Sequence, residues 1–319
     1  MSGEKLSLKD LARKRDLLAP GHRLCAGCGA AIVARLVMKA TRGPTIVACA
    51  TGCLEVATTI FPYTAWRVPW IHSAFENVAS TASGIEAGLK ALKRAGKLKY
   101  DHVDVIAFGG DGATYDIGFQ AISGAFERGH DILYVLYDNE AYMNTGIQRS
   151  GGTPKYASTT TSPAGKVIPG KLELKKPISH IMVAHRIPYV ATASPAYPLD
   201  LMRKVRRGLE VEGPAFIHIL APCPRGWRFD PRYTIEMARL AVQTCVFPLW
   251  EAENGKYKLT GVSRSIARNP KMKKPVEEYL KRQGRFRHLF TPENRHLVDE
   301  IQKIVDEEWN WLLKMCQLS

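Results

Sequence analysis

Short apolar runs alternate with segments of helical periodicity through the first 220 residues, and this alternation constrains the fold more than any other feature. The apolar runs lie at residues 44–49, 103–108, 131–137, 190–193 and 215–220. The helical segments lie at residues 30–39, 74–94, 117–127, 179–185 and 199–209. Continuously apolar runs are typical of strands buried on both faces, as in a parallel sheet. The pattern predicts a doubly wound α/β domain with a mostly parallel sheet.

The pattern changes near residue 235, where the regular alternation ends. Beyond it, helices are expected at residues 234–241, 275–282 and 294–313, with a Lys- and Arg-rich linker between them. We therefore divide the chain into an α/β domain, residues 1–235, and a helical C-terminal extension, residues 236–319, that packs on the core or on a partner.

Residues 149–177 are rich in Gly, Pro, Ser and Thr. A stretch of this length without a helical or strand pattern is unusual for a simple connection in a compact domain. We expect it to be a lid or a binding arm.

Length and composition narrow the class of protein. A chain of 319 residues can bury a large core, and it contains no run of about 20 apolar residues that would span a membrane. Residues 1–15 are polar and lack the apolar centre of a secretory signal. We expect a cytoplasmic protein without membrane contact, in which seven cysteines do not form a disulfide framework.

The chain is strongly basic, with a formal net charge of +15 and an isoelectric point near 9.5. Its basic residues are dispersed, and no helix-turn-helix, zinc-finger or RNA-binding aromatic pattern accompanies them. Dispersed positive charge speeds encounters with anions without reading a nucleotide sequence. We therefore expect acidic protein partners and anionic ligands, and no nucleic acid.

The strongest local signal joins the ends of two predicted strands. Gly110-Asp111-Gly112 follows one strand, and Asn139 follows the next strand 28 residues beyond Asp111. Asp111, Asn139 and the carbonyl oxygen of Ala141 can supply oxygen ligands to Mg²⁺, with diphosphate oxygens and water completing an octahedron. The two glycines let the backbone approach phosphate closely. A lone tight turn is the alternative, but this spacing around a β–α–β unit is typical of thiamine-diphosphate enzymes.

Four cysteines form a second candidate site. Cys25 and Cys28 make a CxxC pair before a predicted helix, whereas Cys53 and Cys223 each follow a predicted strand. Four thiolates suit either Zn²⁺ or a [4Fe–4S] cluster, and the spacing does not separate the two. Zinc usually uses two CxxC pairs, so the single pair favours iron–sulfur. The alternative for Cys53 and Cys223 is a small buried side chain.

The remaining three cysteines have no partner motif. They lie in apolar runs, where a free cysteine usually serves as a small hydrophobic side chain. We expect this structural role for Cys49, Cys245 and Cys316.

From about residue 20 to residue 283 the chain resembles the beta subunits of the pyruvate:ferredoxin oxidoreductases and the matching domain of their single-chain relatives. Long motifs carry the resemblance: Cys-Ala-Gly-Cys-Gly at 25–29, Ala-Thr-Gly-Cys at 50–53, Phe-Glu-Asn at 75–77, Gly-Gly-Asp-Gly-Ala-Thr-Tyr-Asp-Ile-Gly at 109–118, Tyr-Asp-Asn-Glu-Ala-Tyr-Met-Asn-Thr-Gly-Ile-Gln-Arg-Ser at 137–150, Thr-Thr-Thr-Ser-Pro at 159–163 and Ala-Pro-Cys-Pro-Arg-Gly-Trp at 221–227. Matches of this length are specific.

The resemblance implies a role for each site residue. It implies that the [4Fe–4S] cluster nearest the thiamine is held by Cys25, Cys28, Cys53 and Cys223, and Cys53 is also expected among the residues that bind the cofactor. It implies that Mg²⁺ is held by Asp111, Asn139 and Ala141, and that the diphosphate is lined by Gly110, Gly112, Ala113 and Thr145. Asn144 would lie near the thiazolium and the substrate. Some family members have a cofactor-contacting Glu where this chain has Ala30.

The same resemblance implies the reaction and the partners. The family uses thiamine diphosphate to decarboxylate a 2-oxoacid oxidatively, passes single electrons through iron–sulfur clusters to ferredoxin, and transfers the acyl group to coenzyme A. The Glu on the pyrimidine side and the ferredoxin-type clusters lie outside this chain, on other subunits. We expect the chain to be inactive alone and pyruvate to be its substrate.

Three alternatives remain. The substrate could be another 2-oxoacid, such as 2-oxoisovalerate, 2-oxoglutarate or oxalate. The chain could belong to a non-oxidative thiamine enzyme, although such an enzyme has no need of four cysteine ligands. It could also be a zinc-stabilised, non-catalytic interaction protein.

Overall fold

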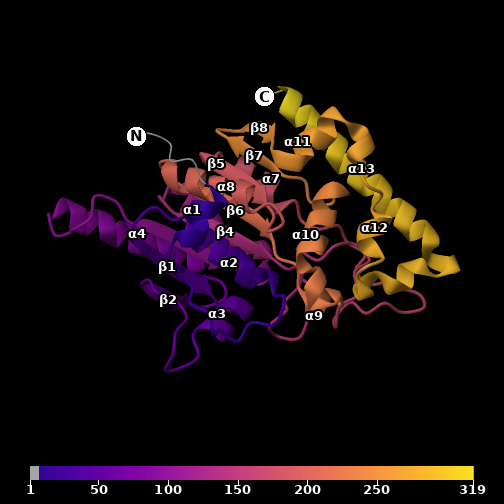
Figure 1. Ribbon diagram of the computed structural model, residues 1–319, viewed down its shortest axis with the longest axis horizontal. Helices are drawn as coiled ribbons and strands as arrows, with labels where there is room; N and C mark the ends of the chain where they lie inside the picture. The colour runs from indigo at the N-terminus through magenta and orange to yellow at the C-terminus, as the bar shows by residue number, and fades with distance from the viewer. Residues whose placement is uncertain (1–6, 319) are drawn as a thin grey trace.

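A computed structural model describes residues 7–318 of the chain (Figure 1). The strands are β1 (Thr45–Ala50), β2 (Trp70–Ser73), β3 (Asp104–Gly109), β4 (Leu133–Asp138), β5 (Tyr189–Ala193), β6 (Ala215–Leu220), β7 (Trp250–Glu253) and β8 (Lys256–Leu259). The α-helices are α1 (Leu8–Arg13), α2 (Gly29–Ala40), α3 (Cys53–Thr58), α4 (Val78–Arg94), α5 (Asp111–Tyr115), α6 (Phe119–Glu127), α7 (Ile178–Ala184), α8 (Pro198–Glu210), α9 (Pro224–Trp227), α10 (Thr234–Gln243), α11 (Gly261–Arg268), α12 (Glu277–Leu280) and α13 (Arg295–Leu318). Short 3-10 helices are η1 (Pro231–Tyr233), η2 (Pro270–Met272), η3 (Gly284–Phe290) and η4 (Pro292–Asn294).

Within residues 7–318 the strands form one eight-stranded sheet in the order β2-β1-β3-β4-β6-β5-β7-β8. The first six strands in this order run parallel, and β7 and β8 add an antiparallel hairpin beside β5. The fold is therefore the mostly parallel α/β class that the sequence predicts. The chain crosses β1 on its way from β2 to β3, which makes the β1–β3 boundary a point where strand order reverses, the usual place for ligands in such sheets.

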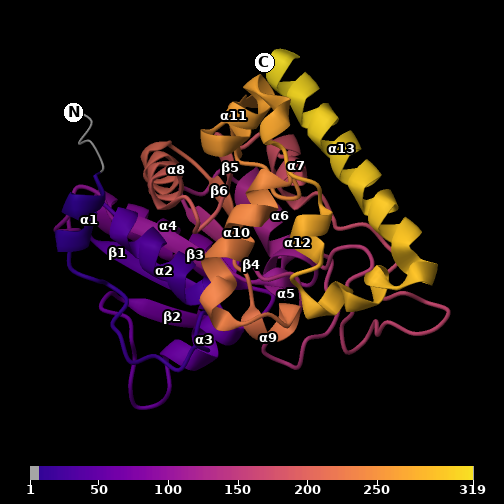
Figure 2. The ribbon, with the colours of Figure 1, turned by 45° about the vertical axis from the view of Figure 1, so that its right-hand side comes forward.

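Helices cover both faces of the sheet (Figure 2). One face packs against α2 and α8, and the other packs against α4, α6 and α7. Side chains alternate along each strand, so that Ile106 and Phe108 point to the α2 side while Val105 and Ala107 point to the α4 side. Both sets are buried, which explains the continuous apolar runs in the sequence.

The predicted strands and helices are confirmed, with ends shifted by a few residues. The expected helix at 275–282 is reduced to the single turn of α12. Three strands were not expected, namely β2, β7 and β8, and each has only four residues.

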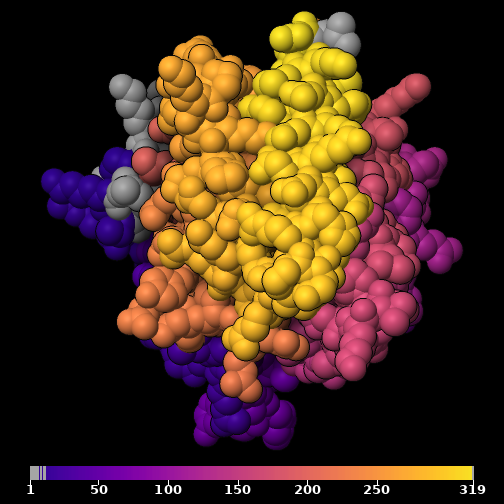
Figure 3. All heavy atoms as spheres, turned by 90° about the vertical axis from the view of Figure 1, so that its right-hand side faces the viewer, coloured from indigo at the N-terminus to yellow at the C-terminus, as the bar shows by residue number. Residues whose placement is uncertain are grey.

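The C-terminal part of the chain covers one side of the molecule, where α13 and the segments before it form a continuous surface (Figure 3). Buried side chains of α13, including Trp309 and Leu312, belong to the same apolar cluster as strand residues such as Tyr134 and Phe216. No helix within residues 7–318 is long and apolar enough to cross a membrane.

Candidate functional site

Four neighbouring strands place the predicted ligands along one edge of the sheet. β1, β3, β4 and β6 are adjacent and parallel. Cys53, Asp111, Asn139 and Cys223 each lie within three residues of the carboxyl end of one of these strands. Residues separated by up to 170 positions in the chain are thereby gathered on one edge, because parallel strands end side by side.

The oxygens predicted to bind Mg²⁺ converge. One terminal atom of the Asn139 side-chain amide lies 2.8 Å from the carbonyl oxygen of Ala141 and 3.2 Å from Oδ1 of Asp111. If that atom is the amide nitrogen, it donates to both oxygens. If it is the amide oxygen, its separations from the other two oxygens are close to the ~3.0 Å edge of an octahedron with metal–oxygen distances of ~2.1 Å. The residues present fit Mg²⁺.

The charge around Asp111 supports the same fit. The residue is 3% exposed, and its Oδ2 accepts a hydrogen bond from Ser150 Oγ at 2.5 Å. Burial, followed by the nearby negative charge of Asp138, holds the pKa of Asp111 well above its usual value. A cation bound by Asp111 would supply the positive charge that this buried carboxylate lacks.

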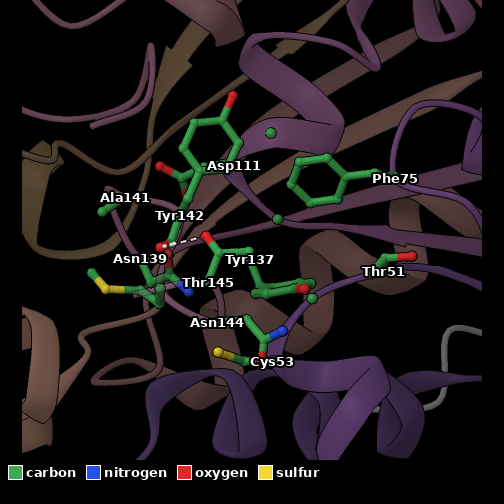
Figure 4. Close-up of a pocket in the computed structure, with 14 residues that line it drawn as sticks. Thr51, Cys53, Phe75, Asp111, Tyr137, Asn139, Ala141, Tyr142, Asn144 and Thr145 are labelled. Atoms are coloured by element: carbon green, nitrogen blue, oxygen red, sulfur yellow. Dashed lines mark hydrogen bonds between the residues drawn. The ribbon is translucent and has the colours of Figure 1, made fainter. Parts of the chain in front are cut away.

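A cavity lies beside these oxygens, with Phe75 and Tyr142 among its lining side chains (Figure 4). Gly112 also lines it. A Cβ atom at this position would lie 2.3 Å from the Tyr142 ring and 2.4 Å from the Phe75 ring. The two rings are 5.7 Å apart between centroids, and the Tyr142 hydroxyl donates to Asp116 Oδ2 at 2.7 Å. Only glycine fits between them without displacing an aromatic ring.

Most of the predicted cofactor residues line this one cavity of about 130 Å³: Cys53, Gly110, Asp111, Gly112, Asn139, Ala141, Asn144 and Thr145. Ala113 does not line it. Its side chain is fully buried in α5, and its carbonyl oxygen accepts a hydrogen bond from the Tyr134 hydroxyl at 2.9 Å. Ala30 is also buried and lies in the first turn of α2, outside the cavity lining.

The CxxC pair is built on a tight turn. The Cys28 N–H donates to the Cys25 carbonyl oxygen at 3.0 Å, and Gly27 between them has a φ of 68°. Thr234 Oγ1 donates to the Gly27 carbonyl oxygen at 2.6 Å, which ties the turn to the start of α10. Cys223 caps α9, and its Sγ accepts a hydrogen bond from the Gly226 N–H at 3.3 Å.

The four cysteines are close enough to influence one another. Burial raises the pKa of Cys53 to about 12, and the nearby Cys28, Cys223 and Cys25 add to the increase. Burial likewise raises the pKa of Cys28 to about 11. Within residues 7–318 no group of three or more His, Cys, Asp or Glu side chains is arranged around a single-metal position. The effects of Cys28, Cys223 and Cys25 on the pKa of Cys53 nevertheless indicate that the four thiols lie near one another.

The other three cysteines lie elsewhere. Cys49 is fully buried in β1, Cys245 is buried after α10, and Cys316 is half-buried near the end of α13. None of the three lines the cavity.

A buried polar network that the sequence analysis missed stands behind the metal loop, residues 138–141. Asp138 Oδ2 accepts hydrogen bonds from Tyr115 Oη at 2.7 Å and from Lys175 Nζ at 2.6 Å, and lies 2.6 Å from His218 Nε2. Although burial opposes it, the charge of Lys175 and the bond to His218 hold the pKa of Asp138 below its ordinary value. The adjacent acid, Glu140, pairs with Lys175 Nζ at 2.9 Å and with Arg285.

Comparison with known proteins agrees with this geometry. The family model "Thiamine pyrophosphate enzyme, C-terminal TPP binding domain" matches residues 50–219. The "Pyruvate synthase subunit PorB" of Methanocaldococcus jannaschii is 60% identical over 92% of this chain and 96% of its own. The protein of the same name from Thermotoga maritima is 51% identical over 98% of both chains.

Two further comparisons match proteins that are named for other 2-oxoacids. The "Ketoisovalerate oxidoreductase subunit VorB" of Pyrococcus abyssi is 49% identical over 93% of both chains. A solved 2-oxoglutarate:ferredoxin oxidoreductase from Magnetococcus marinus shares the fold, with a TM-score of 0.50 and 21% identity over 67% of this chain and 76% of its own. The chain belongs to the family of thiamine-diphosphate-binding subunits of the 2-oxoacid:ferredoxin oxidoreductases, which includes PorB and VorB.

Proposed function

We propose that this subunit holds thiamine diphosphate through Mg²⁺ and a [4Fe–4S] cluster beside it, for the oxidative decarboxylation of pyruvate with coenzyme A and ferredoxin. The observation that carries the proposal is the order of ligands along four adjacent strand ends, Cys53, Asp111, Asn139 and Cys223. This order supports placing the metal–diphosphate site and the thiols at the same edge of the sheet.

Each proposed ligand set uses residues that the fold brings together. Asp111, Asn139 and the Ala141 carbonyl would hold Mg²⁺. Gly110, Gly112 and Thr145 would border the diphosphate, and Ala113 would contribute its backbone N–H, because the first N–H groups of a helix have no partner within it. Cys25, Cys28, Cys53 and Cys223 would hold the cluster.

Thiamine diphosphate, when bound, supplies the electron sink that decarboxylation of a 2-oxoacid requires. The residues of this chain hold and surround it. Asn144 lines the cavity and would orient the substrate, and the rings of Phe75 and Tyr142 would limit the access of water. The aminopyrimidine-side Glu and the ferredoxin-type clusters would come from other subunits.

We further propose that residues 1–235 form the cofactor unit and residues 236–319 an extension, and that the enzyme works in the cytoplasm. The seven cysteines are free, and free thiols would persist in a reducing compartment. The net charge of +15 would favour acidic partners such as ferredoxin.

Metal and cofactor content of the purified complex tests the proposal. Iron, sulfide, zinc and thiamine diphosphate would be measured anaerobically in the wild type, in Cys53→Ala and in the matched control Cys316→Ala. We expect about four irons per copy of this chain beyond those of the partner subunits, lost in Cys53→Ala and kept in Cys316→Ala. Zinc in place of iron would support the interaction-protein alternative, and iron without thiamine diphosphate would refute the proposed catalytic site.

Substrate choice needs a second measurement. The VorB relative makes 2-oxoisovalerate the main competitor to pyruvate. Rates of ferredoxin reduction by the complex would be compared for pyruvate, 2-oxoisovalerate, 2-oxoglutarate and oxalate. A higher kcat/KM for any of the other three would overturn pyruvate as the substrate.

A further inference from the structure

Glu140 occupies an unusual place in the metal loop. It lies between two proposed Mg²⁺ ligands, Asn139 and Ala141, and has a φ of 69°. This left-handed conformation is unfavourable for a residue with a side chain and persists only where the surroundings hold it. The Glu140 N–H donates to Asp138 Oδ1 at 3.0 Å, and its carbonyl oxygen accepts from Thr153 Oγ1 at 2.8 Å.

The Glu140 side chain is held by a cation from a distant part of the chain. Arg285 Nη2 donates to Glu140 Oε2, and both side chains are only 2–3% exposed. Arg285 belongs to η3 in the C-terminal extension, 145 residues from Glu140. Its Nε also donates to Gln283 Oε1 at 2.9 Å, so the guanidinium has a fixed orientation.

The same guanidinium contacts the cysteine loop. Its central carbon lies 4.2 Å from the centroid of the Trp227 ring. Trp227 ends α9, the short helix that begins immediately after Cys223. The Trp227 indole N–H donates to the Asn139 carbonyl oxygen at 2.7 Å. The loop that carries Cys223 and the loop that carries Asn139 are therefore joined through one aromatic ring.

A buried ion pair is not by itself a stabilising device, because desolvation of both charges offsets their attraction. The Arg285–Glu140 pair is better explained by what it positions. Glu140 lies between two proposed metal ligands. Arg285 also packs on the ring of Trp227, which belongs to the loop of the proposed cluster ligand Cys223.

We propose that Arg285 is a positioning residue shared by both cofactor sites: it fixes the metal loop through Glu140 and the Cys223 loop through Trp227. This inference rests on the proposed function, because it requires both sites to be occupied. It follows that a change at Arg285 disturbs Mg²⁺ binding and the cluster environment together, although Arg285 contacts neither proposed ligand group directly.

The test compares Arg285→Met with Arg282→Met in the assembled complex. Arg282 is a matched control, since it lies three residues away and pairs with Glu236 at the surface. Thiamine diphosphate is removed with a chelator, and its rebinding is measured as a function of Mg²⁺ concentration. The reduced cluster is observed by electron paramagnetic resonance, and iron content is measured in parallel.

We expect Arg285→Met to raise the Mg²⁺ concentration for half-saturation by ~10-fold or more, as for other residues that orient metal ligands. Its resonance spectrum should also change, whereas Arg282→Met should match the wild type in both readouts. An Arg285→Met complex that assembles and matches Arg282→Met in both would overturn the inference. Arg285→Lys, which keeps the charge without the guanidinium fork, should restore Mg²⁺ binding only in part.

A second variant decides the matter if Arg285→Met does not assemble. Trp227→Phe keeps an aromatic ring under Arg285 but removes the N–H donated to Asn139 together with the five-membered part of the indole. We expect it to weaken Mg²⁺ binding several-fold and to alter the spectrum. Trp227 is fully buried, so the melting temperature should also fall, and binding is measured well below the melting temperature of the variant. Wild-type behaviour of Trp227→Phe would refute the coupling. A wild-type complex without iron or thiamine diphosphate would instead refute the proposed function, before any variant is compared.

Discussion

The carboxylate of Asp111 is buried beside a second acid, and such a group destabilises a protein unless a cation or donors offset it. We predict opposite effects of Asp111→Asn on stability and on binding. Without Mg²⁺ the variant should melt at a higher temperature than the wild type, because a buried charge is removed. Mg²⁺-dependent binding of thiamine diphosphate should weaken by about 3 kcal/mol, roughly a hundredfold.

The control for this prediction is Asp101→Asn at an exposed position. Melting temperature and equilibrium dialysis measure the two effects. Unchanged cofactor binding in Asp111→Asn would mean that the converging oxygens do not form the metal site.

His180 gives a prediction about pH. Its ring stacks on Trp250 with centroids 4.9 Å apart, and burial lowers its pKa to about 4. Below its ordinary pKa near 6.5 the unfolded chain binds a proton that the folded chain does not. Stability associated with His180 is therefore present above about pH 6.5 and is lost as the pH falls toward 4, by at most about 3 kcal/mol.

His180→Phe keeps the stacking and removes this titration. The melting temperature of the wild type should fall more than that of the variant between about pH 7 and pH 5. Equal decreases would show that His180 is protonated as readily in the folded chain as in the unfolded one.

The residues of the candidate site differ in whether their roles could be predicted from the sequence. Asp111 and Asn139 were predictable because each follows a strand of a recognisable β–α–β unit. Lys175, Trp227 and Arg285 were not, because their contacts with the metal loop join residues 35 to 145 positions apart. The sequence does not encode such contacts in any local pattern. They follow from how residues 149–177, α9 and η3 pack against the metal loop.

Among the elements, the β7–β8 hairpin has a local sequence signal, a turn dipeptide between alternating residues, from which it could have been predicted. Asn254 and Gly255 have φ angles of 49° and 79°, as in the tight turns favoured by Asn-Gly, and the flanking residues alternate between buried and exposed. Four-residue strands beside charged side chains gave no continuous apolar run, so the hairpin was missed.

The turn supports a matched pair of substitutions. Gly255→Ala should destabilise the protein by about 1 kcal/mol, since its φ is unfavourable for alanine, while a Cβ would meet no neighbour. Gly88→Ala, in the exposed part of α4, should stabilise by about 0.5–1 kcal/mol, because alanine favours helix and the site is open.

Melting temperatures of the two variants test this prediction with the same chemical change. Shifts of the same sign would contradict it. Two increases would show that the backbone conformation of Gly255 imposes no cost, and two decreases would show that alanine does not favour the helix at residue 88.

On the scale of the whole molecule, one apolar cluster runs from the α4 side of the sheet to α13. Trp309→Ala should therefore destabilise the entire chain, by about 3–5 kcal/mol, because the side chain is only 6% exposed. The neighbouring Asn310→Ala, on the exposed side of α13, should change stability by less than about 0.5 kcal/mol. A separate early melting transition in Trp309→Ala would show instead that the extension unfolds independently.

The cysteine positions also bear on how the protein is made. The proposed cluster ligands span residues 25 to 223, so the last of them leaves the ribosome nearly 200 residues after the first. They come together only after β1, β3, β4 and β6 have assembled, because Cys53 follows β1 and Cys223 follows β6. Iron delivered to a nascent chain before residue 223 emerges would find three of the four thiols and no sheet to hold them together. Biogenesis should therefore run in a set order, in which the sheet folds first and then serves as the template on which the cofactor is assembled.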